Sequence, residues 1–116
     1  MYLQFVRDNS QLVKGTLTTV VLKLLSDHHR MYGYEITKLV QELTDGKIQL
    51  TEGALYPTLH KLEAEGLIQS TLEQSGNRPR KYYHLTRSGK KETKYKLAHL
   101  YDFITNIQNL LGLKPS

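Results

Sequence analysis

The sequence lacks cysteine and tryptophan, and it contains no long hydrophobic run. Without thiols the chain cannot form a disulfide framework, a cysteine-based zinc site or a thiol nucleophile. The longest uninterrupted aliphatic run is residues 20–22, so no segment is expected to span a bilayer. Arg7, Asp8 and Lys14 interrupt the apolar core that a signal peptide would need. These absences predict a cytoplasmic protein with no membrane partner.

The positive charge of the chain is concentrated in one segment. The chain has 116 residues, which suits one domain with an appended helix, and a formal net charge of +5. Half of its 16 basic residues lie between Arg78 and Lys96, where only Glu92 offsets them. A local positive field of this kind is typical of a face that binds a polyanion. The alternative is a charged helix start that only contacts solvent.

Hydrophobic spacing predicts three helices followed by a hairpin. Apolar residues recur at intervals of three and four over residues 16–28, 33–44 and 52–66, with Gly15 and Thr16 as capping positions for the first helix. The alternating residues 47–50 predict a short strand. Strands are predicted at 67–73 and 80–85, joined by a turn over 74–79 with Pro79 at the loop edge. The prediction is a mainly α fold with a small β-wing, a winged helix-turn-helix.

The last predicted helix, residues 87–111, is capped by Thr86 and ended by Gly112. It carries a heptad seam of residues spaced three and four apart: Leu97, Leu100, Ile104, Ile107 and Leu111. So small a domain cannot bury this seam together with Tyr101, so pairing with a second copy is predicted. Packing on the chain's own helices is the alternative. Apolar residues near the N-terminus are expected to join the same interface: Tyr2, Leu3, Phe5, Val6, Leu12 and Val13.

The chain therefore divides into three predicted parts. Residues 1–14 contribute to a homodimer, residues 15–86 form the DNA-binding domain, and residues 87–112 form the dimerisation helix. Such a domain places its third helix in the major groove of double-stranded DNA, while the hairpin follows the neighbouring backbone.

The third predicted helix has an outward face that can contact DNA. With its leucines inward, this face comprises Glu52, Gly53, Tyr56, Pro57, Thr58, His60 and Lys61. Its hydroxyl, imidazole and amino groups can bond to bases or phosphates. Glu52 either accepts from a cytosine amino group or only complements the helix N-terminus. Pro57 inside the helix predicts a local bend that aims Tyr56 and Thr58.

The hairpin supplies the cations of the predicted interface. Arg78, Arg80 and Lys81 stand at its tip and along its second strand. We expect them to contact phosphates, which adds affinity without sequence specificity.

Enzyme motifs are missing. The five histidines show no His-Glu-x-x-His pattern, and there is no Gly-x-Ser-x-Gly elbow or phosphate-binding glycine loop. No catalytic activity and no cofactor are predicted. Asp27, His28 and His29 could begin the metal site of a metal-sensing repressor, but an exposed turn between helices is the preferred interpretation.

Four stretches carry a resemblance to a known family: LVKGTLTTVVLKLLS, YGYEITKLVQEL, LTEGALYPTLHKLEAEGLI and RPRKYYHLTRSGKK. Together they resemble the PadR family of bacterial transcriptional regulators, in its small form with a single tail helix. The resemblance covers residues 12–91. It implies a dimeric winged-helix repressor that binds an inverted repeat and dimerises through its C-terminal helix, with help from the N-terminal segment.

The resemblance also implies roles for individual residues. Tyr34 would contact the DNA backbone, and Arg78, Arg80 and Lys81 would lie on the wing. The positions that fall on the reading helix are Thr51, Gly53, Ala54, Tyr56, Pro57 and Lys61.

A small-molecule effector at the dimer interface is a further implication of the resemblance. Some small members hold flat drugs there with a tryptophan of the last helix. This chain has Leu100 near that place and no tryptophan, which argues against multidrug sensing. Tyr101 and Phe103 remain candidate lining residues. The alternative to a repressor is a winged-helix protein-interaction module without specific DNA binding.

Overall fold

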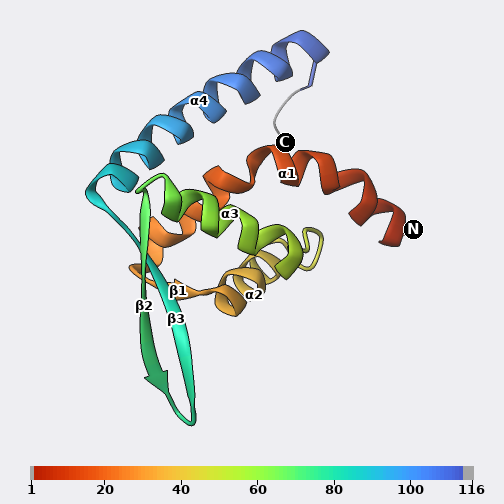
Figure 1. The fold of residues 1–116 in the computed structure, drawn as a ribbon. Coiled ribbons are helices and arrows are strands. Elements are labelled where there is room, and N and C mark those ends of the chain that lie inside the picture. The colour runs from red at the N-terminus through yellow and green to blue at the C-terminus, as the bar shows by residue number, and fades with distance from the viewer. Residues whose placement is uncertain (1, 114–116) are drawn as a thin grey trace.

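A computed structural model describes the backbone of residues 2–113 and the side chains of residues 10–113. Its elements are α1 (Tyr2–His28), β1 (Met31–Tyr32), α2 (Gly33–Leu43), α3 (Glu52–Ala64), β2 (Ile68–Ser75), β3 (Arg78–Leu85) and α4 (Arg87–Leu111). The strands form one antiparallel sheet in the order β1–β3–β2. The β2–β3 hairpin projects from the helical body, and α4 lies at the opposite end (Figure 1). The predicted fold class is confirmed.

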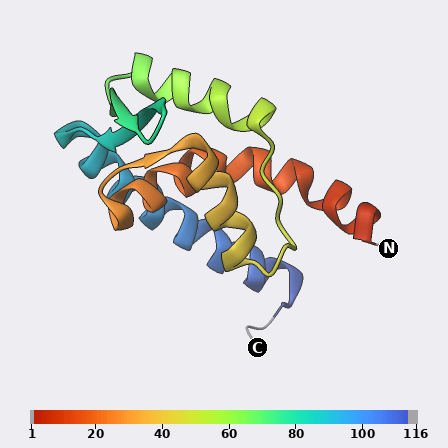
Figure 2. The same ribbon diagram turned by 90° about the horizontal axis from the view of Figure 1, so that it is seen from below.

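The hydrophobic core lies where the first three helices meet the base of the hairpin. Leu55, Leu59 and Leu62 of α3 have no exposed surface, as their spacing predicted. The buried residues of the hairpin all lie at its base: Ile68, Tyr83 and Leu85. The rest of the hairpin therefore reaches into solvent. Helix α1 packs against both α3 and α4, which lie on opposite sides of it (Figure 2).

The predicted start of the first helix was wrong. Helix α1 begins at Tyr2 and runs through Gly15 without a break. Thr16 does not act as a cap, because its hydroxyl donates to the Leu12 carbonyl oxygen at 2.8 Å within the helix. One glycine inside a helix costs only about 1 kcal/mol, which a long helix tolerates.

The predicted strand at residues 47–50 was also wrong. This segment is a loop, held at its start by the Thr44 hydroxyl, which accepts a hydrogen bond from the Ile48 N–H at 3.0 Å. Ile48 is half-buried and Leu50 is buried. The alternation that predicted a strand therefore reflects a loop that inserts two side chains into the core.

The hairpin is longer than predicted. Its strands are joined by only two residues, Gly76 and Asn77, instead of the predicted turn over 74–79. Gly76 has a φ of 63°, which fits the first position of a type II′ turn. Pro79 lies within β3 opposite Gln74 instead of at the loop edge. The unpredicted strand β1 is too short to show an alternating pattern.

The start of α4 is attached to the end of α3. The Thr86 hydroxyl accepts from the Gly89 N–H at 3.0 Å and donates to the Gly66 carbonyl oxygen at 2.7 Å. Thr86 therefore caps α4 as predicted, and the predicted bounds of this helix are confirmed. The junction fixes the direction in which α4 leaves the body.

Gly89 should be essential for this junction. A Cβ at this position would collide with the backbone carbonyl oxygen of Leu67 and lie 3.0 Å from its carbon. We expect Gly89→Ala to lower the free energy of unfolding by about 2–3 kcal/mol, measured by chemical denaturation. Gly15→Ala is the matched control, because nothing lies within 4 Å of a Cβ there. An unchanged unfolding midpoint for Gly89→Ala would contradict the close approach.

Candidate nucleic-acid interface

Helix α3 presents a largely exposed face. Its first turn is capped by the Thr51 hydroxyl, which accepts from the Ala54 N–H at 3.2 Å. The three buried leucines hold the opposite face against the core. Most residues predicted for the outward face of α3 are exposed: Glu52, Gly53, Pro57, His60 and Lys61. Ala54, a position implied by the resemblance, is exposed as well.

Two predicted contact residues of α3 are instead half-buried and engaged with the chain itself. The Tyr56 ring lies against Gly33, where a Cβ would stand 2.8 Å from the ring carbon Cζ. The Thr58 hydroxyl donates to the Ala54 carbonyl oxygen at 3.2 Å. Tyr56 thereby joins α3 to the start of α2, and only a glycine at position 33 permits this approach.

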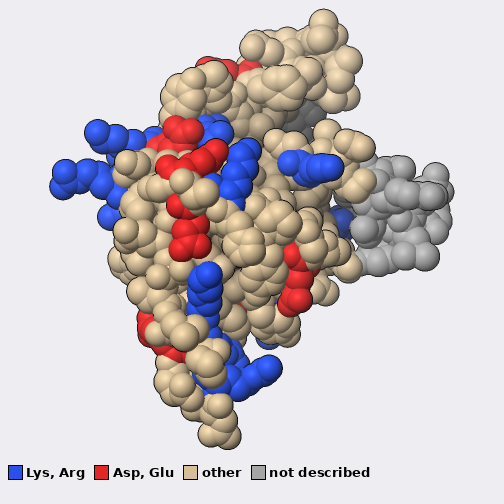
Figure 3. Space-filling model, viewed as in Figure 1, with Lys and Arg blue, Asp and Glu red and all other residues tan. Residues whose placement is uncertain are grey.

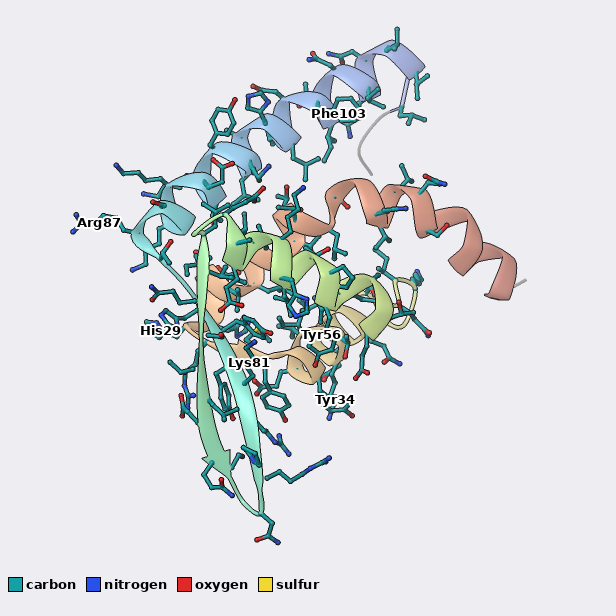
Figure 4. All side chains as sticks on the ribbon, in the orientation of Figure 1. His29, Tyr34, Tyr56, Lys81, Arg87 and Phe103 are labelled. Carbon is teal, nitrogen blue, oxygen red and sulfur yellow. The ribbon has the colours of Figure 1, made fainter. Side chains whose placement is uncertain are left out.

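A cleft of about 560 Å³ opens between α3, the start of α2 and the hairpin. Six predicted contact residues line it: Tyr34, Glu52, Tyr56, Arg78, Arg80 and Lys81. Figure 4 shows Tyr34, Tyr56 and Lys81 coming together from these three elements. The structure thus brings half of the twelve predicted DNA-contact residues into one cleft.

The cleft is electropositive. Three cationic side chains and the single carboxylate of Glu52 line it, which gives the lining a net charge of +2. Glu52 lies in the first turn of α3, where the helix dipole favours a negative charge. Its position therefore fits the helix-stabilising interpretation as well as a base contact.

Tyr83 forms part of the cleft wall and is 1% exposed. Burial raises the pKa of its phenol above the usual 10.0, and the charge of Glu63 raises it further. The phenol therefore stays neutral at physiological pH, and Tyr83 acts as a packing residue beneath the cations.

The basic cluster of the sequence is divided in space. Figure 3 shows Lys and Arg side chains on the hairpin and, separately, around the start of α4. Lys81, the last hairpin cation, lies four residues before the end of β3 at Leu85, and at about 3.4 Å per residue this stretch separates the two groups by about 14 Å. Arg87 points away from Lys81 (Figure 4), and Lys90 lines a different cleft beside His84. Only the hairpin half of the cluster faces the cleft.

The remaining predicted contact residues lie elsewhere on α3. Four of them line a second cleft of about 460 Å³ between α3 and α1: Gly53, Ala54, Pro57 and Thr58. Thr51 and Lys61 are exposed near the two ends of the helix. The predicted residues of α3 therefore lie on both of its flanks, with the exposed surface between them.

Tyr32 lines the first cleft but was missed by the sequence reasoning. It belongs to β1, which is too short to be predicted. One signal was available in the sequence, because the tripeptide Arg-x-Tyr occurs at residues 30–32 and again at 80–82.

The six residues predicted for dimerisation, which are Tyr101 and the five of the seam, are only partly covered in the single chain. Tyr101 is 72% exposed, Ile104 47% and Leu111 61%. The other seam residues are half-buried: Leu97, Leu100 and Ile107. Near the N-terminus, Leu12 is exposed and Val13 half-buried, whereas the side chains of Tyr2, Leu3, Phe5 and Val6 lie outside the described residues.

Asp27 of the possible metal site pairs instead with Lys23, at 2.8 Å. Among the side chains of residues 10–113, no three acidic or histidine groups are arranged to hold a metal ion. Within the described part of the chain, no helix has the length and apolarity needed to cross a membrane.

The fold and the cleft define a winged helix-turn-helix protein, in which α2 and α3 form the helix-turn-helix and the β2–β3 hairpin is the wing. The model of the transcriptional regulator PadR-like family matches residues 21–95. The chain belongs to this family, and it is a transcriptional regulator rather than an enzyme.

Similar proteins include two of known structure. A PadR family regulator from Eggerthella lenta matches with a TM-score of 0.76 and 30% identity, over 97% of each chain. A transcriptional regulator from Clostridium thermocellum has the same TM-score and identity, over 85% of this chain and 95% of its own. By sequence, a transcriptional regulator of Mycobacterium tuberculosis is 42% identical over 52 residues, which are 45% of this chain and 49% of that protein.

Proposed function

We propose that the chain is a homodimeric repressor that binds an inverted-repeat operator through α3 and the wing. The observation that carries the proposal is the electropositive cleft between these two elements. Phosphates of the DNA backbone complement such a cleft, and their contacts supply most of the affinity. Sequence is then read by the exposed face of α3, which is the element that enters the major groove in this fold.

The residues of the interface divide by role. Arg78, Arg80 and Lys81 of the wing bind phosphates, and Tyr34, which is 57% exposed beside them, contacts the backbone. The residues that approach base edges or flanking phosphates belong to α3 and its cap: Thr51, Glu52, Gly53, Ala54, Tyr56, Pro57, Thr58 and Lys61. Most of these residues lie in the N-terminal half of α3, the half that reads bases in helix-turn-helix proteins.

Dimerisation pairs the α4 seam with that of a second copy, and residues 1–14 add to the interface. The exposed apolar side chains of α4 support this proposal, because a solitary chain would leave a large apolar stripe in water. Two copies place their α3 helices on half-sites about one helical turn apart, ~10 bp. A small-molecule effector binds at this interface in a site lined by Tyr101 and Phe103. Its binding releases the protein from the operator.

A titration of labelled DNA from upstream of the gene, against a scrambled duplex, tests this function. Fluorescence anisotropy should show tighter binding to the upstream DNA, and the logarithm of the binding constant should fall linearly with the logarithm of salt, by about 0.9 per phosphate contact. Light scattering should give the mass of a dimer. A monomer without DNA affinity would instead favour a protein-interaction module, and binding indifferent to salt would exclude the phosphate contacts.

A further inference from the structure

Two arginines and two tyrosines form a continuous stack across the sheet at the edge of the cleft. The guanidinium carbon of Arg30 lies 4.1 Å from the Tyr82 ring centroid, and that of Arg80 lies 4.4 Å from the Tyr32 centroid. The two rings meet edge to face, with their centroids 5.3 Å apart. These distances are those of cation–π and aromatic pairs. We call these four residues the arginine–tyrosine stack.

The stack follows from the register of the sheet. Tyr32 of β1 is the direct partner of Tyr82 of β3. In antiparallel strands a residue also faces the diagonal neighbours two positions away on the partner strand. Each arginine precedes a tyrosine by two positions, so each lies over the tyrosine of the opposite strand. The repeated Arg-x-Tyr tripeptide therefore encodes the stack.

Arg30 also forms an ion pair with Glu73, which lies on the far side of β3 in strand β2. The register places Glu73 directly opposite Arg80. Among the described side chains, however, Arg80 forms no ion pair. Because Arg30 engages the carboxylate that faces Arg80, the Arg80 guanidinium keeps its N–H donors for another anion.

The Arg30–Glu73 pair contributes little to folding stability. The two side chains are 49% and 40% exposed, and ion pairs at such positions are weak. Its consequence is geometric, because it reaches from the residue before β1 across β3 to β2 and determines which arginine engages the carboxylate. Arg80 lines the cleft together with Tyr32, whose ring limits the orientations available to the guanidinium.

We propose that Arg30, Tyr32 and Tyr82 are positioning residues that hold Arg80 ready for a DNA phosphate. This inference rests on the proposed function. Tyr32 holds the Arg80 side chain in place before DNA arrives, which lowers the ordering cost of binding. Tyr82 orients Tyr32, and Arg30 withholds Glu73 from Arg80.

A double-mutant cycle between Tyr32 and Arg80 tests the first part of the proposal. Tyr32→Leu should weaken DNA binding about 5- to 30-fold, which corresponds to one exposed cation–π contact in each subunit of the dimer. Tyr32→Phe keeps the ring and should bind as the wild type does. In the Arg80→Ala background, Tyr32→Leu should cause no further loss, because the residue it positions is gone.

A second cycle tests the part played by Arg30. Arg30→Gln should weaken DNA binding, because Glu73 then turns to Arg80. Adding Glu73→Gln should raise the affinity more in the Arg30→Gln background than in the Lys90→Gln background. Lys90→Gln is the matched control, since Lys90 and Arg30 line the same cleft and both changes remove one charge.

The outcomes separate this inference from the proposed function. Arg80→Ala without any loss of DNA affinity would overturn both the wing contact and the positioning of Arg80. A loss with Arg80→Ala, combined with a Tyr32→Leu effect that is absent or additive to it, would overturn the positioning alone. Equal Glu73→Gln gains in both backgrounds would overturn the role of Arg30. Because a misfolded Tyr32→Leu protein would also give the additive result, the cycle uses Tyr32→Leu only with a thermal unfolding midpoint equal to that of Tyr32→Phe.

Discussion

Replacing Arg78, Arg80 and Lys81 together by glutamine should lower operator affinity by on the order of 10³-fold or more near 0.1 M salt. The variant removes three cleft cations per subunit and therefore six per dimer. Each lost phosphate contact reduces the steepness of log K against log salt by about 0.9. The loss of six contacts should therefore reduce that slope by about 5. Scrambled DNA should lose affinity in the same proportion, because phosphates carry no sequence. Anisotropy titrations over a salt series measure both quantities.

The matched control replaces Arg87, Lys90 and Lys91 by glutamine. It removes the same charge from the start of α4, which the structure separates from the cleft. We expect a much smaller loss of affinity, because those side chains act only through the long-range field, which salt screens beyond about 10 Å. Equal losses in the two triple variants would show that net charge matters and that the cleft does not.

Replacing Ile104 by glutamate should dissociate the dimer. Ile104 lies in the middle of the seam and is 47% exposed in the single chain, so the subunit should remain folded. A dimer would have to bury two unpaired carboxylates, which should raise its dissociation constant by about 10³-fold or more. Sedimentation or light scattering over a concentration series measures this shift.

The loss of the dimer should carry over to DNA. A monomer engages one half-site and forgoes the second, linked contact, which is worth about 10²- to 10⁴-fold in affinity. Asn109→Glu is the matched control, because residue 109 is exposed and lies on the opposite face of α4 at 100° per residue. An Ile104→Glu protein that stays dimeric and binds the operator normally would place the dimer interface elsewhere.

The elements that sequence reasoning predicted well are those set by neighbours along the chain. Helix α4 has the predicted bounds because its cap, its periodicity and its terminal glycine all act within one or two turns. The inward leucines of α3 follow from helical spacing in the same way. The errors occurred where a local pattern had two physical origins. The alternation at residues 47–50 belongs to a loop, and Thr16 bonds within α1 instead of capping it.

The structure brings only part of the predicted site together. The wing cations and Tyr34 do meet in one cleft, but Tyr56 and Thr58 turn partly toward the chain itself. The sequence offered no means of foreseeing that Tyr56 would pack on Gly33, because the two residues are distant along the chain. Contacts of this kind depend on how α2 and α3 pack.

The sequence by itself determined most of the helices and the hairpin, because periodicity, caps and turn residues act over a few positions. Its motifs carried the resemblance to the family. It also showed that positive charge is concentrated between Arg78 and Lys96. Only the tertiary structure decided which of those charges face the cleft, because the hairpin cations lie toward the tip of β3 whereas the others lie on α4 beyond its base. The stack of Arg30, Tyr32, Tyr82 and Arg80 was decided there too, since it requires strand pairing between residues about 50 positions apart.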